Sequence, residues 1–403
     1  MKLKTLILAG VMSVASGAAW AACSFENTVP LKSLSAGFEA WKAVTDAMAE
    51  CGNFSASLDQ EFREKQPEAF AANPALYQIG GVSNATLVPL LNAGTIRPLD
   101  DLVAKYGQDL LPNQLIKVDG QTMAIAMMVN AQHLMYRSDI LADLGIAEPK
   151  TYADVLAAAE KIKEAGVVEY PLGGTFKTGW NLGQEFVNMY LGEGGEFFAE
   201  GNMPAINNEQ GVRALETLKA MTAYMDPEYL VSDSTYVQQQ FQQGKIAMAN
   251  LWASRAAAMN DEAESQVVGK VKMAAAPMGS AAPATTIWWD GMVLAKNMSD
   301  EEADAAFRVM MEGIDAEMVQ ANNDVAVWLN PAYTPGELAA GAAASAEAGA
   351  KPYPASGPMG IMHTALGNGL ADYLTGAKDA QTTLADIEAD YLTAAKEAGL
   401  VSN

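Results

Sequence analysis

One short apolar segment ends in three residues whose side chains suit the binding of a small solute. The run 246–251 is too short for a helix and has the length of a buried strand. It carries Asn250, Trp252 and Arg255 toward its carboxyl end, where open α/β sheets bind ligands. An indole face, an amide and a guanidinium suit a neutral hydroxyl-rich ligand or an anionic one. The same pattern also fits a core tryptophan beside two surface polar residues.

The other tryptophans give the next signal. Trp41 falls on the apolar face of an expected helix and is assigned to the core, whereas Trp180 and Trp328 lie in expected loops or at strand ends. Indoles stack on the apolar faces of sugars, while amides and carboxylates hold the hydroxyls. Trp288 and Trp289 would point to opposite faces of a strand, so at most one of them faces a given cleft. We choose Trp289, which is next to Asp290, although both could be ordinary sheet aromatics.

The sequence lacks the common catalytic and metal-binding motifs. Its two histidines, His133 and His363, are far apart, and neither an H-x-x-x-H nor a C-x-x-C pair occurs. A G-x-S-x-G elbow and a Walker A motif are also missing. We therefore expect no metal and no cofactor, and a binding protein rather than an enzyme. A glycoside hydrolase stays possible because it needs only two of the 48 acidic residues.

The elements that must position these residues alternate between strands and helices. Strands are expected at 29–35, 54–58 and 75–79, with a helix at 37–50 after the first of them. This alternation predicts a doubly wound α/β unit, and a second α/β pattern begins at Ser138.

Two further strands, 124–129 and 134–136, follow each other closely, with Asn130 between them. Because no turn signal separates these strands, they are expected to cross between units rather than to form a hairpin. A later strand is expected at 292–295, and Ser299 and Glu302 predict the capping box of a helix.

The first residues indicate export. Lys2 and Lys4 precede an apolar run, and 19–21 fit the A-x-A cleavage rule, so residues 1–21 are predicted to be a signal peptide. The only two cysteines, Cys23 and Cys51, are then expected to form a disulfide in a periplasmic protein. The alternative makes Cys23 a lipid-modified N-terminus and leaves Cys51 unpaired.

The charge limits the partners. Lysine and arginine total 25 and the acids 48, for a formal charge of −23. Nucleic acid and anionic membrane surfaces both select basic footprints, so neither is an expected partner.

Four segments resemble the family 1 extracellular solute-binding proteins of bacterial ABC importers, the sugar-binding group that includes maltose-binding protein. They are 93–101 ("G-x-L-x-P-L-D-D" in the family), 134–139 ("L-x-Y-N-K-D"), 149–152 ("P-x-T-W") and 241–248 ("F-x-x-G-K-x-A-M"). Arg137 and Ser138 depart from the family's Asn-Lys. The order and spacing of the segments extend the resemblance over the whole mature chain.

The resemblance implies a two-lobe periplasmic binding protein fold (type II-like) with the ligand cleft between its lobes. The expected lobes are 22–129 with 287–330, and 130–286 with 331–403. The expected partners are a sugar and the membrane permease of an ABC importer, with the protein itself a monomer. A polyol or a charged solute is the alternative ligand, for which Arg255 and Lys177 would meet a carboxylate or phosphate. The candidate ligand-binding residues are Asp59, Ser83, Asn84, Asn130, Trp180, Asn250, Trp252, Arg255, Trp289, Asp290 and Trp328.

Overall fold

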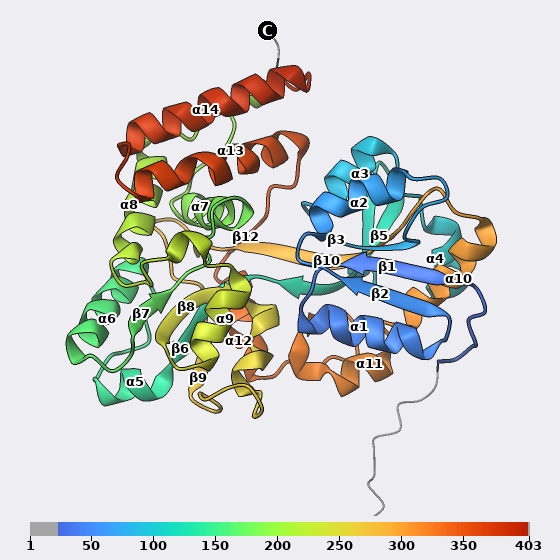
Figure 1. Ribbon diagram of the computed structural model, residues 1–403, viewed down its shortest axis with the longest axis horizontal. Coiled ribbons are helices and arrows are strands. Elements are labelled where there is room, and N and C mark those ends of the chain that lie inside the picture. The colour runs from blue at the N-terminus through green and yellow to red at the C-terminus, as the bar shows by residue number, and fades with distance from the viewer. Residues whose placement is uncertain (1–22, 402–403) are drawn as a thin grey trace, which may run out of the picture.

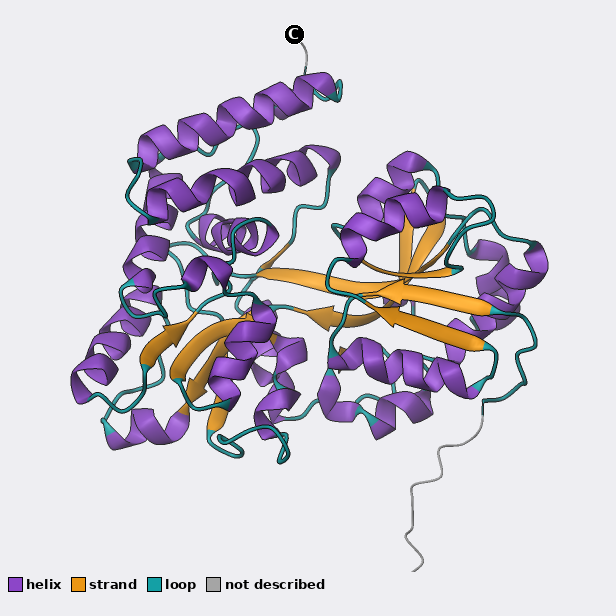
Figure 2. Cartoon of the chain, in the orientation of Figure 1, coloured by secondary structure: helices purple, strands orange, loops and turns teal. Residues whose placement is uncertain are grey.

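The computed structural model describes residues 23–401, so the predicted signal peptide lies outside the described residues. Two β-sheets lie side by side, and each is covered by helices (Figures 1 and 2). The architecture is therefore the two-lobe α/β fold that was expected. In the described part of the chain, no helix combines the length and apolar character needed to cross a membrane.

The first lobe is built on an eight-stranded sheet whose main order is β11-β5-β10-β3-β1-β2, with β4 paired to β5 and β12 to β10. β1 pairs in parallel with β2 and β3, whereas β10 runs antiparallel to both β3 and β5. The strands are β1 (Leu31–Ser35), β2 (Phe54–Leu58), β3 (Ile79–Ser83), β4 (Leu115–Val118), β5 (Gln121–Asn130), β10 (Thr286–Leu294), β11 (Val327–Trp328) and β12 (Lys351–Pro352).

The helices of this lobe are α1 (Glu39–Glu50), α2 (Phe62–Ala71), α3 (Leu87–Ala93), α4 (Asp100–Tyr106), α10 (Asp300–Glu312) and α11 (Ala316–Ala321). The assignment of Trp41 to the core is confirmed, because it is buried there together with Val44 and Met48 of α1. The capping box of Ser299 and Glu302 also forms at the start of α10.

The second lobe contains a four-stranded sheet in the order β7-β8-β6-β9. Its strands are β6 (Gln132–Arg137), β7 (Tyr170–Gly173), β8 (Ile246–Trp252) and β9 (Val271–Ala274). Its helices are α5 (Ser138–Asp143), α6 (Tyr152–Ala165), α7 (Trp180–Gly192), α8 (Glu209–Thr222), α9 (Ser234–Gln242), α12 (Ala340–Glu347), α13 (Gly357–Leu374) and α14 (Ala380–Glu397). The last two helices pack on α7 and α8.

Among the segments that connect the lobes, two involve β-strands. β5 belongs to the first sheet and β6 to the second, and only Ala131 separates them, which confirms the predicted crossing. β10 also extends from one lobe into the other, as the long strand across the middle of Figure 1 shows. The strand predicted at 292–295 is thus the end of a longer one that begins at Thr286.

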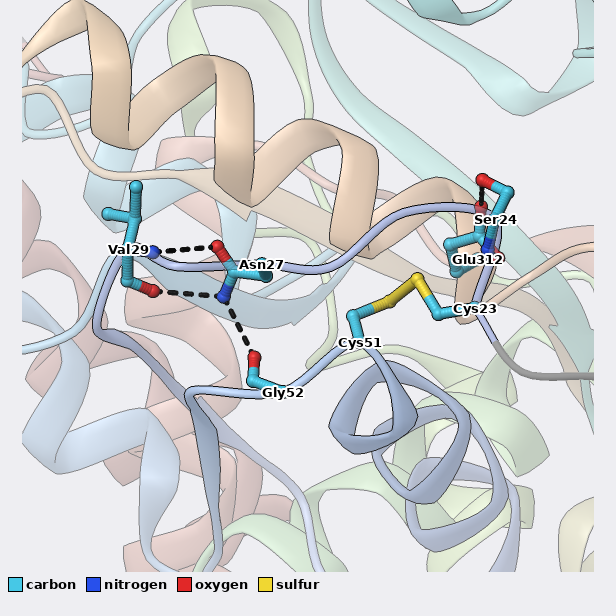
Figure 3. The surroundings of a disulfide bond; sticks show 7 residues. All are labelled: Cys23, Ser24, Asn27, Val29, Cys51, Gly52 and Glu312. Carbon is cyan, nitrogen blue, oxygen red and sulfur yellow. Dashed lines mark hydrogen bonds between the residues drawn. A yellow bond between two sulfur atoms is a disulfide. The ribbon is translucent and has the colours of Figure 1, made fainter.

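The predicted disulfide is present. Cys23 and Cys51 are joined with their Cα atoms 4.9 Å apart, so the bond ties the start of the described chain to the end of α1 (Figure 3). Beside it, the backbone N–H of Ser24 donates to the carboxylate of Glu312 on α10, at 3.1 Å. Since both cysteine sulfurs are used in the disulfide, Cys23 has no free thiol for a lipid.

Candidate ligand-binding cleft

A cavity of about 160 Å³ lies between the two lobes and is lined by both of them. Its first-lobe side is formed at the carboxyl ends of β1, β2, β3 and β5, which is the edge where α/β sheets bind ligands. The lining residues are Ala36, Phe38, Gln60, Phe62, Arg63, Ser83, Asn130, Lys177, Trp180, Asn181, Asp233, Ser234, Thr235, Trp252, Ser254, Arg255, Trp288 and Asp290.

Three tryptophans form one wall of the cleft. Trp180 is the first residue of α7, Trp252 the last of β8, and Trp288 lies on β10. The rings of Trp180 and Trp252 are nearly parallel, with centroids 6.3 Å apart. Trp288 meets both rings edge-on, with centroids 5.6 and 5.9 Å away. The wall therefore offers a continuous aromatic surface drawn from three separate parts of the chain.

Residues behind the wall hold Trp180 in place. The Nε2 atom of His363 lies 2.9 Å from the backbone carbonyl of Trp180, and its Nδ1 atom lies 2.8 Å from the hydroxyl of Tyr353. Because a carbonyl can only accept, Nε2 carries the proton and Nδ1 accepts from the tyrosine. Burial lowers the pKa of His363 to about 4, so the ring is neutral and keeps this tautomer at physiological pH.

One basic and one acidic side chain, Arg63 and Asp290, face the aromatic wall. The guanidinium carbon of Arg63 lies 4.4 Å from the centroid of a Trp180 ring, which is a cation–π contact. Asp290 lines the cleft, and desolvation there raises the pKa of its carboxyl to about 7. The positive charge of Arg63 and a hydrogen bond from Asn130 oppose that rise. The carboxyl is thus poised to gain or lose a proton near neutral pH.

Two more cations lie on the second-lobe side. Arg255 donates from Nη1 to the amide oxygen of Gln238 at 2.9 Å, and burial lowers its pKa to about 10, so it remains charged at neutral pH. Lys177 lies 3.5 Å from the carboxylate of Asp233. The lining therefore holds donors and acceptors of both charges, arranged around an aromatic surface.

A pair of hydrogen bonds joins the lobes at the edge of the cleft. The amide nitrogen of Asn130 donates to the hydroxyl of Ser254 at 3.1 Å, and its oxygen accepts from the Ser254 backbone at 3.3 Å. Asn130 ends β5 of the first lobe, and Ser254 follows β8 of the second. Both side chains are buried, so this link shapes the wall of the cleft next to the crossing.

The structure brings six of the eleven candidate residues into this lining, namely Ser83, Asn130, Trp180, Trp252, Arg255 and Asp290. The remaining five lie outside it. Asp59 instead pairs with Lys65 on α2 and accepts from the backbone of Glu61 at 2.8 Å.

Two candidate asparagines are absent from the lining of the cleft. Asn84 directs its amide nitrogen to the backbone oxygen of Ile287 at 3.5 Å. Asn250 points into the second lobe, where its amide nitrogen lies 3.4 Å from the hydroxyl of Tyr152.

The choice of Trp289 over Trp288 as the residue facing the cleft is wrong. Both lie in β10 and point to opposite faces, and Trp289 packs against the first-lobe cluster that contains Phe70 and Leu87. Trp288 is the one that lines the cleft. Trp328 is a core residue, 3% exposed, whose indole N–H donates to the carbonyl of Asn322 at 2.9 Å.

Sequence reasoning missed Gln60, Phe62 and Arg63, which bring a cation and an aromatic ring to the first-lobe side of the cleft. Phe62 and Arg63 begin α2, Gln60 lies in the turn between β2 and α2, and α2 was not predicted. The carboxyl end of the predicted strand 54–58 was the available signal, because the next residues must lie at the ligand-binding edge.

Comparison with known proteins decides the family. Residues 59–316 match the family model described as bacterial extracellular solute-binding protein, which is more than half of the chain. The chain belongs to this family. The members are solute-binding components that work with ABC transporter permeases outside the cytoplasm, and they are not enzymes, so a glycoside hydrolase is excluded.

Individual relatives agree with this assignment. A probable ABC transporter-binding protein of Deinococcus radiodurans is 26% identical over 321 residues, which cover 72% of this chain and 73% of the relative. A probable sugar-binding periplasmic protein of Mesorhizobium japonicum is 26% identical over 154 residues, or 36% of each protein.

Solved structures of ABC transporter solute-binding proteins share the fold. A protein of Agrobacterium radiobacter K84 in complex with ribitol has a TM-score of 0.81 at 20% identity, covering 92% of this chain and 100% of the other. A protein of Agrobacterium vitis S4 with bound D-mannitol has a TM-score of 0.79 at 20% identity, covering 92% and 99%.

Proposed function

We propose that this extracellular solute-binding protein binds a neutral sugar or polyol between its lobes and delivers it to the permease of an ABC importer. The observation that carries the proposal is the three-tryptophan wall opposite Arg63 and Asp290. Indole rings stack on the C–H faces of such ligands. The Asp290 carboxylate would accept from ligand hydroxyls, and the guanidinium of Arg63 would donate to their oxygens.

The size of the cavity favours a ligand no larger than a single sugar unit. Pockets for drug-sized ligands hold about 300 to 1,000 Å³, whereas this cavity holds about 160 Å³. A monosaccharide or an acyclic polyol of similar size suits that space better than an oligosaccharide. The ribitol and D-mannitol bound by two proteins of the same fold are ligands of this kind.

We further propose that the lobes are 22–129 with 287–330 and 130–286 with 331–403, and that they close around the ligand as rigid bodies. The sheet memberships of β5, β6 and β10 support these limits, and β12 of the segment 331–403 joins the first sheet only through the first two residues of β10. We also propose that residues 1–21 are cleaved as a signal peptide and that the mature protein is a monomer. Nucleic acids are not among its proposed partners. The periplasm is then the site of function.

The charged residues support a second candidate, an anionic solute such as a sugar acid. Arg63, Lys177 and Arg255 outnumber the two acids of the lining, Asp233 and Asp290. Protonation of Asp290, whose pKa is about 7, would increase that excess of positive charge.

Thermal unfolding of the mature protein separates these candidates. The panel contains ribitol, D-mannitol, D-glucose, maltotriose and D-gluconate. A ligand at a hundred times its Kd adds about 2.7 kcal/mol to the free energy of unfolding. We expect stabilisation by one of the first three compounds. Stabilisation by gluconate alone would favour the anionic candidate, and stabilisation by maltotriose alone would contradict the size argument.

A further inference from the structure

A group of buried polar side chains lies directly behind the tryptophan wall. They come from β6, α7, β10 and the segment after β7, and all are at most 3% exposed. The members are Gln132, Thr175, Gln184, Glu185, Asn188 and Thr286. Ligand binding as proposed above does not use any of them, and polar groups at this depth are costly unless they are hydrogen-bonded.

The hydrogen bonds form a continuous chain that starts at the wall. The indole N–H of Trp288 donates to the hydroxyl of Thr286 at 2.8 Å, and that hydroxyl donates to the amide oxygen of Asn188 at 2.9 Å. The amide nitrogen of Asn188 donates to the oxygen of Gln132, whose own nitrogen donates to the carboxylate of Glu185 at 2.9 Å. Every step points the same way, from the cleft toward a buried carboxyl.

Glu185 fixes the direction of the chain because its Oε1 atom is the final acceptor. It accepts from the amide of Gln132 and from the hydroxyl of Thr175. An amide that donates to Glu185 must present its oxygen to Asn188, and the same reasoning orients Asn188 toward Thr286. The hydroxyl of Thr286 accepts from Trp288 and also from Gln184, at 2.9 Å.

The chain joins the parts of the molecule that meet at the crossing between the lobes. Gln132 begins β6 immediately after the crossing residue Ala131, and Thr286 begins β10, the other strand shared between the lobes. Asn188 and Glu185 lie on α7, whose first residue is Trp180 of the wall. An apolar core would have filled this space without such links, so the network adds a defined orientation to the packing.

We propose that Thr286 is a positioning residue for the ligand cleft. Its hydroxyl holds the indole of Trp288 so that only the ring faces the ligand, and it ties that orientation to both crossing strands. The inference rests on the proposed function in one respect, namely that Trp288 contacts the ligand. Trp288 then contributes stacking and no hydrogen-bond donor, because its single N–H is already used by Thr286.

The test uses the ligand-free mature protein labelled with ¹⁵N-tryptophan, so it does not depend on the identity of the ligand. The indole N–H signal of Trp288 is assigned by its loss in Trp288→Phe. In the wild-type protein, this N–H should exchange with solvent at least tenfold more slowly than those of the half-buried Trp180 and Trp252. Equal exchange rates for the indole N–H groups of these three tryptophans in the wild-type protein would overturn the proposal.

Variants of Thr286 form the second part of the test, because they remove or restore the hydroxyl that accepts from Trp288. Thr286→Val keeps the shape and removes the hydroxyl, so the Trp288 signal should shift and its exchange should accelerate at least tenfold. Thr286→Ser restores the hydroxyl and should restore the slow exchange. Thr383→Val is the matched control, because it removes another buried threonine hydroxyl, 1% exposed, on α14.

An unchanged Trp288 signal in folded Thr286→Val would overturn the positioning role, as would an equal change in Thr383→Val. Failure of all sugars and polyols in the binding panel would contradict the proposed function and leave these signals unaffected. The two proposals therefore fail separately.

Discussion

Glu185 makes the stability of this protein depend on pH in a direction opposite to most carboxylates. It is 3% exposed, and its hydrogen-bond partners, Gln132 and Thr175, are neutral. Burial raises the pKa of its carboxyl from 4.5 to about 7, although both hydrogen bonds oppose the rise. The folded protein therefore retains a proton that the unfolded chain releases near pH 4.5.

The expected magnitude follows from this difference in pKa. Each tenfold change in proton affinity corresponds to about 1.4 kcal/mol, so complete ionisation costs the folded state about 3 kcal/mol. The loss begins near pH 4.5, grows as pH rises, and is complete above about pH 7. At roughly 2.1 cal/mol/K of unfolding entropy per residue, it corresponds to about 4 °C in the Tm of a chain of this size.

The variant Glu185→Gln removes the titration and keeps an oxygen that can accept from Gln132. We expect it to match the wild type at pH 4 and to gain about 3 kcal/mol over it at pH 8. Urea unfolding at a series of pH values measures the difference, in which the titration of all other groups cancels. Glu164→Gln, an exposed position on α6, is the control and should show no such trend. A constant difference between Glu185→Gln and the wild type from pH 4 to pH 8 would refute the reasoning.

Three further predictions concern the cleft and the disulfide. Trp252→Ala should weaken binding of the ligand found in the panel by about 2 kcal/mol in calorimetry, while Trp289→Ala, beside the cleft but facing away, should bind normally. A neutral polyol should bind about tenfold more tightly at pH 8 than at pH 6, because the carboxylate form of Asp290 is the better acceptor; Asp290→Asn should abolish this dependence. Replacing Cys23 and Cys51, 28 residues apart, by serine should lower the free energy of unfolding by about 3 to 4 kcal/mol, as measured in urea.

The sequence was sufficient for the fold class because the hydrophobic periodicities are strong and local. The apolar stripe of α1 and the apolar run of β8 each identify an element without reference to its neighbours. The family motifs then supplied the two-lobe arrangement, which no local pattern contains.

The third strand shows why a local pattern can mislead. The strand predicted at 75–79 lies too early in the chain, because Gly80 and Gly81, which follow it, are inside β3 (Ile79–Ser83). A Cβ atom on Gly80 would come within 2.5 Å of the ring of Phe70, and one on Gly81 within 2.7 Å of the ring of Trp41. The glycines are needed because aromatic rings pack closely on both faces of the strand, and those rings belong to helices elsewhere in the sequence.

Only part of the candidate site was predicted, because the position of its other residues depends on contacts between distant parts of the chain. Ser83, Asn130 and Trp252 end strands, so the rule for carboxyl edges places them correctly. The choice between Trp288 and Trp289 depends on the face of β10, which pairing with β3 and β5 fixes. Arg63 needed α2, whose interior Pro67 and polar composition hide its periodicity.

The position of β10 in the first sheet has a consequence for folding during export. This strand lies between β3 and β5, yet residues 286–294 follow the whole second sheet in the chain. The first lobe therefore cannot complete its sheet when only its N-terminal residues have emerged, although Cys23 and Cys51 can already meet. A chain truncated before residue 286 should keep this lobe open to protease. If the chain is exported through its predicted signal peptide, the N-terminal lobe is expected to remain incomplete until residues 286–294 have followed it across the membrane.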